Sequence, residues 1–259
     1  MSKRNNFFGS KSSYTARTIA FLSATGITDT TIANALNTMD LSLISSGLDV
    51  LIEALYPYVG GTATTHKYNF MNPADTDAAY RITWAGGITH DANGVTGNGS
   101  TGKGDTHWAA TAGNLYDRSF SFYMRTITLA ETQWSGVFTG GRVFGVNIHK
   151  GTPPRIEGHG LNSLTAYSFN MNYGFLGASV HSSAANDAFY VNNGATLFTA
   201  TSGANPVTGN AWTLALNGVG FFSSRNYGFE HYGKGMTSAQ LISLGTIVQT
   251  FNTALSRNV

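Results

Sequence analysis

The chain has 259 residues, of which 15 are lysine or arginine and 13 are aspartate or glutamate, so its formal net charge is only +2. Charged residues make up 11% of the sequence and cysteine is absent, which excludes disulfides and thiolate metal sites and predicts no strongly acidic or basic partner. The 31 glycines and the 12% of aromatic residues favour strands and tight turns over a helical bundle or a disordered chain.

No apolar run approaches the roughly 20 residues that a membrane-spanning helix needs. The N-terminus is basic, but the apolar stretch Thr18–Ala24 is short and lacks a small-residue cleavage pattern. We therefore predict neither a membrane span nor a signal peptide.

Residues 1–28 are predicted to form an N-terminal arm. They carry Lys3, Arg4, Lys11 and Arg17 and no acidic residue. Three interpretations fit: a flexible tail, an arm that becomes ordered against a neighbouring subunit, or an electrostatic contact with nucleic acid. Because the charges are so widely spread, they predict no specific nucleic-acid partner, and the arm is the favoured functional alternative.

Residues 29–57 are predicted to form a helical hairpin. Thr30 or Thr31 can cap a first helix, and apolar residues then recur at helical spacing. A second helix is predicted to end at Tyr56, because the residue before Pro57 is pushed out of the α region. The apolar positions of the two helices are Ile32, Leu36, Met39, Leu48, Leu51, Ile52 and Leu55.

Residues 58–259 are predicted to form one β domain, whose start is marked by Gly60-Gly61. Short runs with alternating apolar residues recur between glycine- and asparagine-rich turns. The clearest runs are Ser119–Thr128, Arg142–His149 and Thr165–Met171. Many short strands without helices between them predict a mainly β fold, namely an antiparallel two-sheet jelly-roll sandwich.

The end of the chain predicts a hairpin and then a closing helix. Asn217-Gly218 separates two short apolar runs and favours a tight turn. Thr237, with Gln240 three residues later, has the pattern of a capping box, which predicts a helix over residues 237–256. The apolar stripe of this helix consists of Leu241, Leu244, Val248, Phe251 and Leu255.

The segment Gly97–Gly104 matches a phosphate-binding glycine pattern. Such a loop binds an anion with its backbone amides and the N-terminus of the helix that follows. Here the strand-like run Asp105–Trp108 follows, so we predict a glycine-rich turn.

The C-terminal segment "FFSSRNYGFEHYGKGMTSAQLISLGTIVQTFNTALSRN" resembles the closing segment of concanavalin A-like (LamG-like) jelly-roll domains in tailed-phage virion proteins. There, a G-x-G-[LM]-[ST] turn leads into a helix that ends in a Q-x-F-x-x-x-L-x-R pattern. The matching positions are Gly233, Gly235, Met236, Thr237, Gln249, Phe251, Leu255 and Arg257. The stretch Ala54–Gly99 resembles the same group, and together the two stretches cover about a third of the chain.

Jelly rolls of this class include polysaccharide hydrolases, which need two carboxylates held ~5–9.5 Å apart. The glutamates are scattered along the sequence, at Glu53, Glu131, Glu157 and Glu230, and do not form the clustered strand motif of these hydrolases. The protein is therefore predicted not to be an enzyme. The resemblance also implies a calcium ion at the sheet rim, for which Asp91, Asn93 and Asp105 are the candidate ligands; no other cofactor is predicted.

A glycan site needs aromatic faces on which sugars stack, flanked by groups that bond hydroxyls. Trp108 with the nearby Asp105, and the cluster Tyr227, His231 and Tyr232, have this chemistry. Trp108 and Tyr232 lie closest to turns and are expected at the surface. The tryptophans expected in the core are Trp84, Trp134 and Trp212.

The resemblance implies a structural protein of the bacteriophage virion, as a capsid decoration, a head fibre or a tail component. Its jelly roll would project from the particle, with other virion proteins as partners and a homotrimer by analogy with phage fibres. Host surface glycan is a further expected partner. A receptor-binding adhesin proper and a glycan depolymerase are the alternatives, and the position on the particle is left open.

Overall fold

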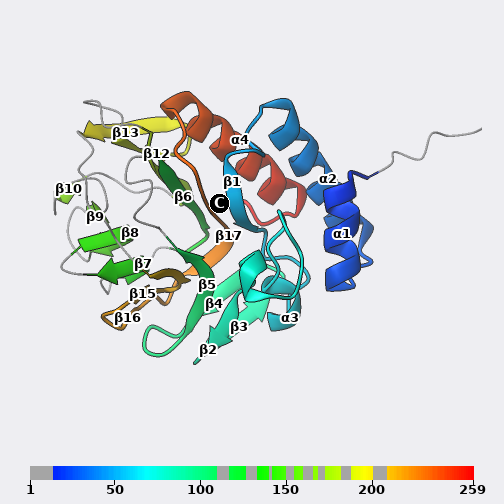
Figure 1. Cartoon of the computed structure of the whole chain (residues 1–259), viewed down its shortest axis with the longest axis horizontal. Coiled ribbons are helices and arrows are strands. Elements are labelled where there is room, and N and C mark those ends of the chain that lie inside the picture. The colour runs from blue at the N-terminus through cyan, green and yellow to red at the C-terminus, as the bar shows by residue number, and fades with distance from the viewer. Residues whose placement is uncertain are drawn as a thin grey trace, which may run out of the picture.

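The computed structural model describes residues 14–109, 117–126, 133–139, 142–149, 155–159, 166–168, 173–181, 188–200 and 209–259. This part of the chain forms three layers, namely two β-sheets packed face to face and a layer of helices on the first sheet (Figure 1). The mainly β sandwich predicted from the sequence is confirmed. No helix among these residues is long and apolar enough to cross a membrane.

The first sheet has eight strands among the described residues, in the order β13-β12-β11-β6-β17-β4-β3, with β1 paired to β17. The strands are β1 (Ile52–Tyr56), β3 (Ile88–Asp91), β4 (Gly94–Gly97), β6 (Arg118–Met124), β11 (Gly174–Val180), β12 (Ala188–Asn192), β13 (Ala195–Ala200) and β17 (Asn226–Gly233). Every residue of β6, β11 and β17 is buried, so the centre of this sheet is covered on both faces.

The second sheet has nine strands among the described residues, in the order β10-β9-β8-β7-β14-β5-β2, joined by β15 and β16. The strands are β2 (Thr83–Ala85), β5 (Lys103–Ala109), β7 (Gln133–Thr139), β8 (Arg142–His149), β9 (Arg155–His159), β10 (Ala166–Ser168), β14 (Asn210–Thr213), β15 (Ala215–Asn217) and β16 (Phe221–Phe222). Its pairs are antiparallel except that β15 runs parallel to β7. The hairpin predicted around Asn217-Gly218 is confirmed as β15–β16.

The core between the sheets is built from alternate strand positions. Phe120, Phe122 and Met124 of β6 lie on one face, as the alternation in the sequence predicted. Trp108 of β5 and Val137 of β7 belong to the same core. The opposite positions of β6 and β17, such as Tyr123 and Phe229, pack against the helices instead.

The helical layer consists of α1 (Ala16–Thr25), α2 (Thr30–Ser45) and α4 (Ser238–Ala254). Two short elements, α3 (Ala63–His66) and the 3-10 helix η1 (Asp77–Ala79), connect strands. The capping box predicted at the start of α4 is present, since Thr237 Oγ1 accepts the Gln240 N–H and Gln240 Oε1 accepts the Thr237 N–H. The apolar stripe of α4 then packs on the first sheet.

The second helix predicted over residues 48–55 is wrong. Residues 52–56 form β1, which pairs with the central strand β17 and places Leu55 opposite His231. The strand buries Ala54 and Tyr56 between the sheets and Leu55 under the helices. Pairing with a central strand satisfies the backbone of this segment and buries side chains on both faces, which a surface helix would not do.

The interpretation of residues 1–28 as a flexible tail is wrong for the residues of α1. Thr15 caps this helix by accepting the Thr18 N–H, and Arg17 pairs with Asp40 at 2.9 Å and Asp49 at 3.3 Å. The helical pair is therefore α1 with α2. The remainder of the predicted arm, residues 1–13, lies outside the described residues, and the division of the chain into domains stays a prediction.

The turn predicted at Gly97–Gly104 is confirmed. Asn98 Oδ1 accepts the backbone N–H groups of Ser100, Thr101 and Gly102, at 2.9–3.0 Å. Strand β5 then begins at Lys103, so no helix N-terminus faces the loop. This geometry holds the loop together with a local side chain and does not form a phosphate site.

Candidate functional site

Four of the residues predicted to bind a glycan lie in the interior. Trp108 is 4% exposed and Tyr232 is 1% exposed, and their rings stack with centroids 5.0 Å apart between the two sheets. Tyr227 and His231 are also buried. The expectation of surface positions for Trp108 and Tyr232 is therefore wrong, because the alternation of β5 and β17 directs both side chains into the inter-sheet core.

His231 fills a polar niche inside the protein. Its Nδ1 lies 2.7 Å from Ser121 Oγ and its Nε2 lies 3.1 Å from Ser119 Oγ. Burial lowers the pKa of His231 to about 3, so the ring is neutral at physiological pH. This histidine holds strands β6 and β17 together and is closed to a ligand.

The predicted calcium ligands are not brought together. Asp91 and Asn93 share the turn between β3 and β4, where Asp91 Oδ1 accepts the Asn93 N–H at 2.7 Å. Asp105 lies on β5 in the other sheet. Within the described ranges, no group of three histidine or acidic residues is arranged to hold a metal ion. The structure thus separates these three side chains, because β3 and β5 belong to different layers.

The outer face of the second sheet remains accessible at β2, β5 and β14. Because Trp108 and Ala211 point into the core, the alternate residues of their strands point outward. We call this surface the β5–β14 face. It consists of Thr83, Lys103, Asp105, His107, Asn210 and Trp212, all of them partly or fully exposed.

A polar network organises one half of this face. Asp105 Oδ1 accepts the His107 N–H at 2.9 Å, and Asp105 Oδ2 lies 3.4 Å from Asn210 Nδ2. His107 Nε2 lies 2.9 Å from Thr83 Oγ1 and 3.4 Å from Asp77 Oδ1. His107 has a left-handed backbone with φ 56°, which is uncommon for a residue with a side chain. The contacts through Asp105, Thr83 and Asp77 hold the imidazole in place on the surface.

An aromatic ring and a cation form the other half. Trp212 is paired with Asp105 on one side and with Gly136 on the other, so one of its neighbours across the sheet has no side chain. Lys103 Nζ lies 3.7 Å from the centroid of the Trp212 ring. The indole N–H is buried and has no hydrogen-bond partner among the described residues. This face therefore combines a flat apolar ring with a carboxylate, an amide and an ammonium group.

Three residues of this face were not identified from the sequence, namely Lys103, Asn210 and Trp212. Trp212 was predicted in the core. Alternation shows which residues share a face but not which face is buried. A signal was nevertheless present, because Lys103, Asp105 and His107 alternate with Gly104, Thr106 and Trp108. When one face of a strand carries charged residues and the other carries a tryptophan, the charged face is favoured as the solvent-facing one.

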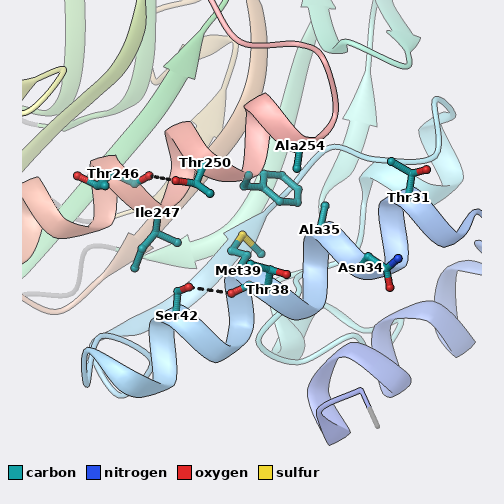
Figure 2. A pocket seen from close by; sticks show the side chains of 11 residues that line it. Thr31, Asn34, Ala35, Thr38, Met39, Ser42, Thr246, Ile247, Thr250 and Ala254 are labelled. Atoms are coloured by element: carbon teal, nitrogen blue, oxygen red, sulfur yellow. Dashed lines mark hydrogen bonds between the residues drawn. The ribbon is translucent and has the colours of Figure 1, made fainter. Parts of the chain in front are cut away.

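A second candidate is the groove between α2 and α4, with a volume of about 460 Å³ (Figure 2). Its lining looks polar in sequence, but the hydroxyls of Ser42, Thr246 and Thr250 bond the helices' own backbones. Thr250 Oγ1 donates to Thr246 O at 2.9 Å, and Ser42 Oγ donates to Thr38 O at 2.8 Å. With Met39 and Ile247, the groove offers mainly apolar contacts and no charged group, so it has less recognition chemistry than the β5–β14 face.

No protein-family model matches the sequence, and no curated protein matches it. Solved structures that are similar include a Trypanosoma rangeli sialidase in complex with sialic acid, at 12% identity and a TM-score of 0.45 over 74% of this chain and 32% of that one. A mutant of the same sialidase displaying trans-sialidase activity has 12% identity and a TM-score of 0.47, over 88% and 40%. This chain thus spans about a third of the length of the sialidase.

Domain 4 of AbnA, a GH43 extracellular arabinanase from Geobacillus stearothermophilus, in complex with arabinotriose, is also similar. The identity is 15% and the TM-score 0.40, over 75% of this chain and 98% of that domain. At these identities and TM-scores the likeness assigns no function to this chain. None of these matches is a phage protein, and the LamG-like resemblance gains no family match.

The prediction that the protein is not an enzyme is corrected. The similar solved structures are named as a sialidase and as a domain of an arabinanase, which runs against excluding catalysis. The exclusion is therefore withdrawn. No particular activity is transferred to this chain in its place.

Proposed function

We propose that this chain is a glycan-binding β-sandwich protein that recognises saccharides with the β5–β14 face. The observation that carries the proposal is the partly exposed Trp212 ring beside Asp105 and Asn210 on the outer face of the second sheet. Aromatic rings stack on the CH surfaces of sugars, and carboxylate and amide groups bond the hydroxyls. In the described part of the chain, this is the face where all three chemical groups meet.

We further propose that the protein works on a bacteriophage particle, in contact with other virion proteins and as a homotrimer. The resemblance of residues 221–258 to the closing segment of phage jelly rolls supports this part of the proposal. In the structure, two residues of that pattern serve the fold: Thr237 caps α4, and Gln249 Oε1 accepts the Tyr123 hydroxyl at 2.8 Å. These contacts support the fold, and the resemblance of the segment supports the virion context. Glycan binding is supported separately, by the β5–β14 face.

Glycan binding is tested with the Trp212→Ala variant. Binding of the full-length protein to a panel of bacterial surface oligosaccharides is measured by array and calorimetry. Trp212→Ala should lower affinity at least tenfold, in line with the loss of a stacking ring. The control is Tyr173→Ala, which removes an exposed aromatic ring directly before β11 of the first sheet and should leave binding unchanged. Binding that survives Trp212→Ala, or no binding to any saccharide, contradicts the proposed face.

The same incubations also test a depolymerase activity. Shortened oligosaccharides, detected by mass spectrometry, would show that the protein cleaves the glycan that it binds. A ligand recovered intact would support recognition alone. The two results separate an adhesin from a depolymerase without changing the assigned face.

The particle context is tested by electron microscopy of intact and genome-free phage labelled with a binder raised against the sandwich. Label on the head would support a decoration or head-fibre role, and label at the tail tip would support host recognition. Absence of label from every particle would overturn the virion part of the proposal. Native mass spectrometry of the isolated protein tests the trimer.

A further inference from the structure

Lys103 is a cation of the β5–β14 face that pairs with no carboxylate of the described residues. Its ammonium lies over the Trp212 ring and makes no ion pair or hydrogen bond with the described residues. A cation over a partly exposed ring is held weakly compared with a cation bonded to a carboxylate. Lys103 can therefore leave the ring when a better partner arrives.

The other charges near this face are already paired. Lys67 and Arg81 both bond Asp75, at 2.7 and 3.1 Å. Arg81 Nε also bonds Asp77 Oδ1 at 2.9 Å, and Asp77 in turn lies 3.4 Å from the His107 ring. These contacts leave Lys103 as the charge for which a ligand can supply the partner.

Asp105 is likewise engaged, by the His107 N–H and by Asn210. Because these groups are donors to Asp105, they offset part of its negative charge at the place where a sugar would bind. An anionic ligand on Trp212 would thus meet the Lys103 ammonium on one side and a carboxylate that is already bonded on the other.

We propose that the β5–β14 face selects saccharides that carry a carboxylate. This inference rests on the proposed function. The sugar ring stacks on Trp212 after Lys103 swings aside, and the Lys103 ammonium then pairs with the sugar carboxylate. Asn210 and Asp105 bond the ring hydroxyls and fix the orientation of the sugar.

The test uses matched ligands and matched variants. Uronic-acid and nonulosonic-acid oligosaccharides are each compared with the same oligosaccharide after carboxyl reduction, by calorimetry on the full-length protein. The acidic forms should bind about tenfold more tightly, and the difference should shrink as salt rises. Lys103→Gln should remove this preference, so that the acidic and the reduced forms bind with equal affinity. Lys234→Gln, which removes an exposed lysine at the end of β17, should change neither.

The outcomes separate this inference from the proposed function. Equal binding of acidic and reduced forms, still sensitive to Trp212→Ala, would overturn the carboxylate selectivity and keep the glycan-binding face. A preference for acid that survives Lys103→Gln would overturn the role of Lys103. No binding of either form would overturn both proposals.

Discussion

Arg257, close to the end of the chain, donates four hydrogen bonds from a buried guanidinium group. Its Nε bonds Asn252 Oδ1 at 2.8 Å, which ties it to α4. Its Nη1 bonds Tyr58 O at 2.8 Å, and its Nη2 bonds Pro57 O and Gly228 O at 2.6 Å each. Burial lowers the pKa of Arg257 to about 9, which still leaves it charged at neutral pH. One side chain thus joins the closing helix to β17 and to the segment after β1.

We expect Arg257→Lys to lower the free energy of unfolding by about 2–4 kcal/mol, because an ammonium group cannot reach four acceptors spread over a planar fork and leaves buried carbonyls unpaired. Urea unfolding of both proteins measures the difference. Arg81→Lys is the control, since its ion pairs with Asp75 and Asp77 are exposed and screened by solvent and should change the free energy of unfolding little. Similar losses in the two variants would show that the fork of Arg257 has no special role.

Helices and strands whose formation depends on residues close together in the sequence were predicted correctly. The predictions of the capping box of α4, of the alternation in β6 and of a strand over Arg142–His149 are confirmed, since each depends on residues a few positions apart. Residues 48–55 were misassigned because their apolar spacing fits a helix as well as a strand with two buried faces. The partner that decides between them, β17, lies about 180 residues further along the chain.

The distance in sequence between paired strands also explains why Trp108 and Trp212 were predicted on the wrong faces of their strands. Trp108 was expected outside and Trp212 inside, and the structure has the opposite. Moving a strand by one residue exchanges its faces, and the sequence of one strand does not contain the position of the sheet that covers it. The candidate face therefore became visible only when β2, β5 and β14 were placed side by side. Asp105 is the one predicted glycan residue that the structure keeps on an accessible face.

The helix that covers the first sheet is expected to depend on its cap. Thr237→Ala removes the acceptor for the Gln240 N–H and should cost about 1 kcal/mol, or roughly 2–4 °C in Tm for a chain of this size. Thr237→Ser keeps the acceptor and should stay within about 0.5 kcal/mol of the parent. Calorimetry of the two variants measures the effect, and an equal loss in both would point to the threonine methyl group instead of the cap.

At the scale of the molecule, the interior holds acidic and basic groups with opposite pH dependence. Glu230 accepts hydrogen bonds from Tyr58 and Tyr232, each at 2.5 Å, and burial raises its pKa from 4.5 to about 7. Burial lowers the pKa of His66 and of His231 from 6.5 to about 3. The stability linked to Glu230 is present below pH 4.5 and is lost as pH rises through 7. That linked to the histidines is present above pH 6.5 and is lost as pH falls toward 3.

Between pH 4.5 and 6.5, Glu230 and the two histidines change the free energy of unfolding in opposite directions as pH rises. The unfolded chain takes up a proton at each of the two histidines, while the folded protein keeps one more at Glu230. These three groups give a net difference of one proton, and His90, whose pKa burial also lowers, adds to it, so the free energy of unfolding should rise by at least about 1.4 kcal/mol per pH unit in the middle of this range. Glu230→Gln removes the opposing proton, so its slope should be steeper than that of the parent by about 1.4 kcal/mol per pH unit.

Urea unfolding at half-unit pH steps from 4.5 to 8 measures both slopes. Between the ends of this range, the variant should gain roughly 3 kcal/mol relative to the parent, because only the parent must ionise a buried carboxyl as pH rises. His181→Gln, which removes an exposed histidine, should leave the slope of the parent unchanged. Parallel curves for the parent and Glu230→Gln would mean that Glu230 has the same pKa in the folded protein as in the unfolded chain, and that the tyrosine pair stabilises the carboxylate enough to offset its burial.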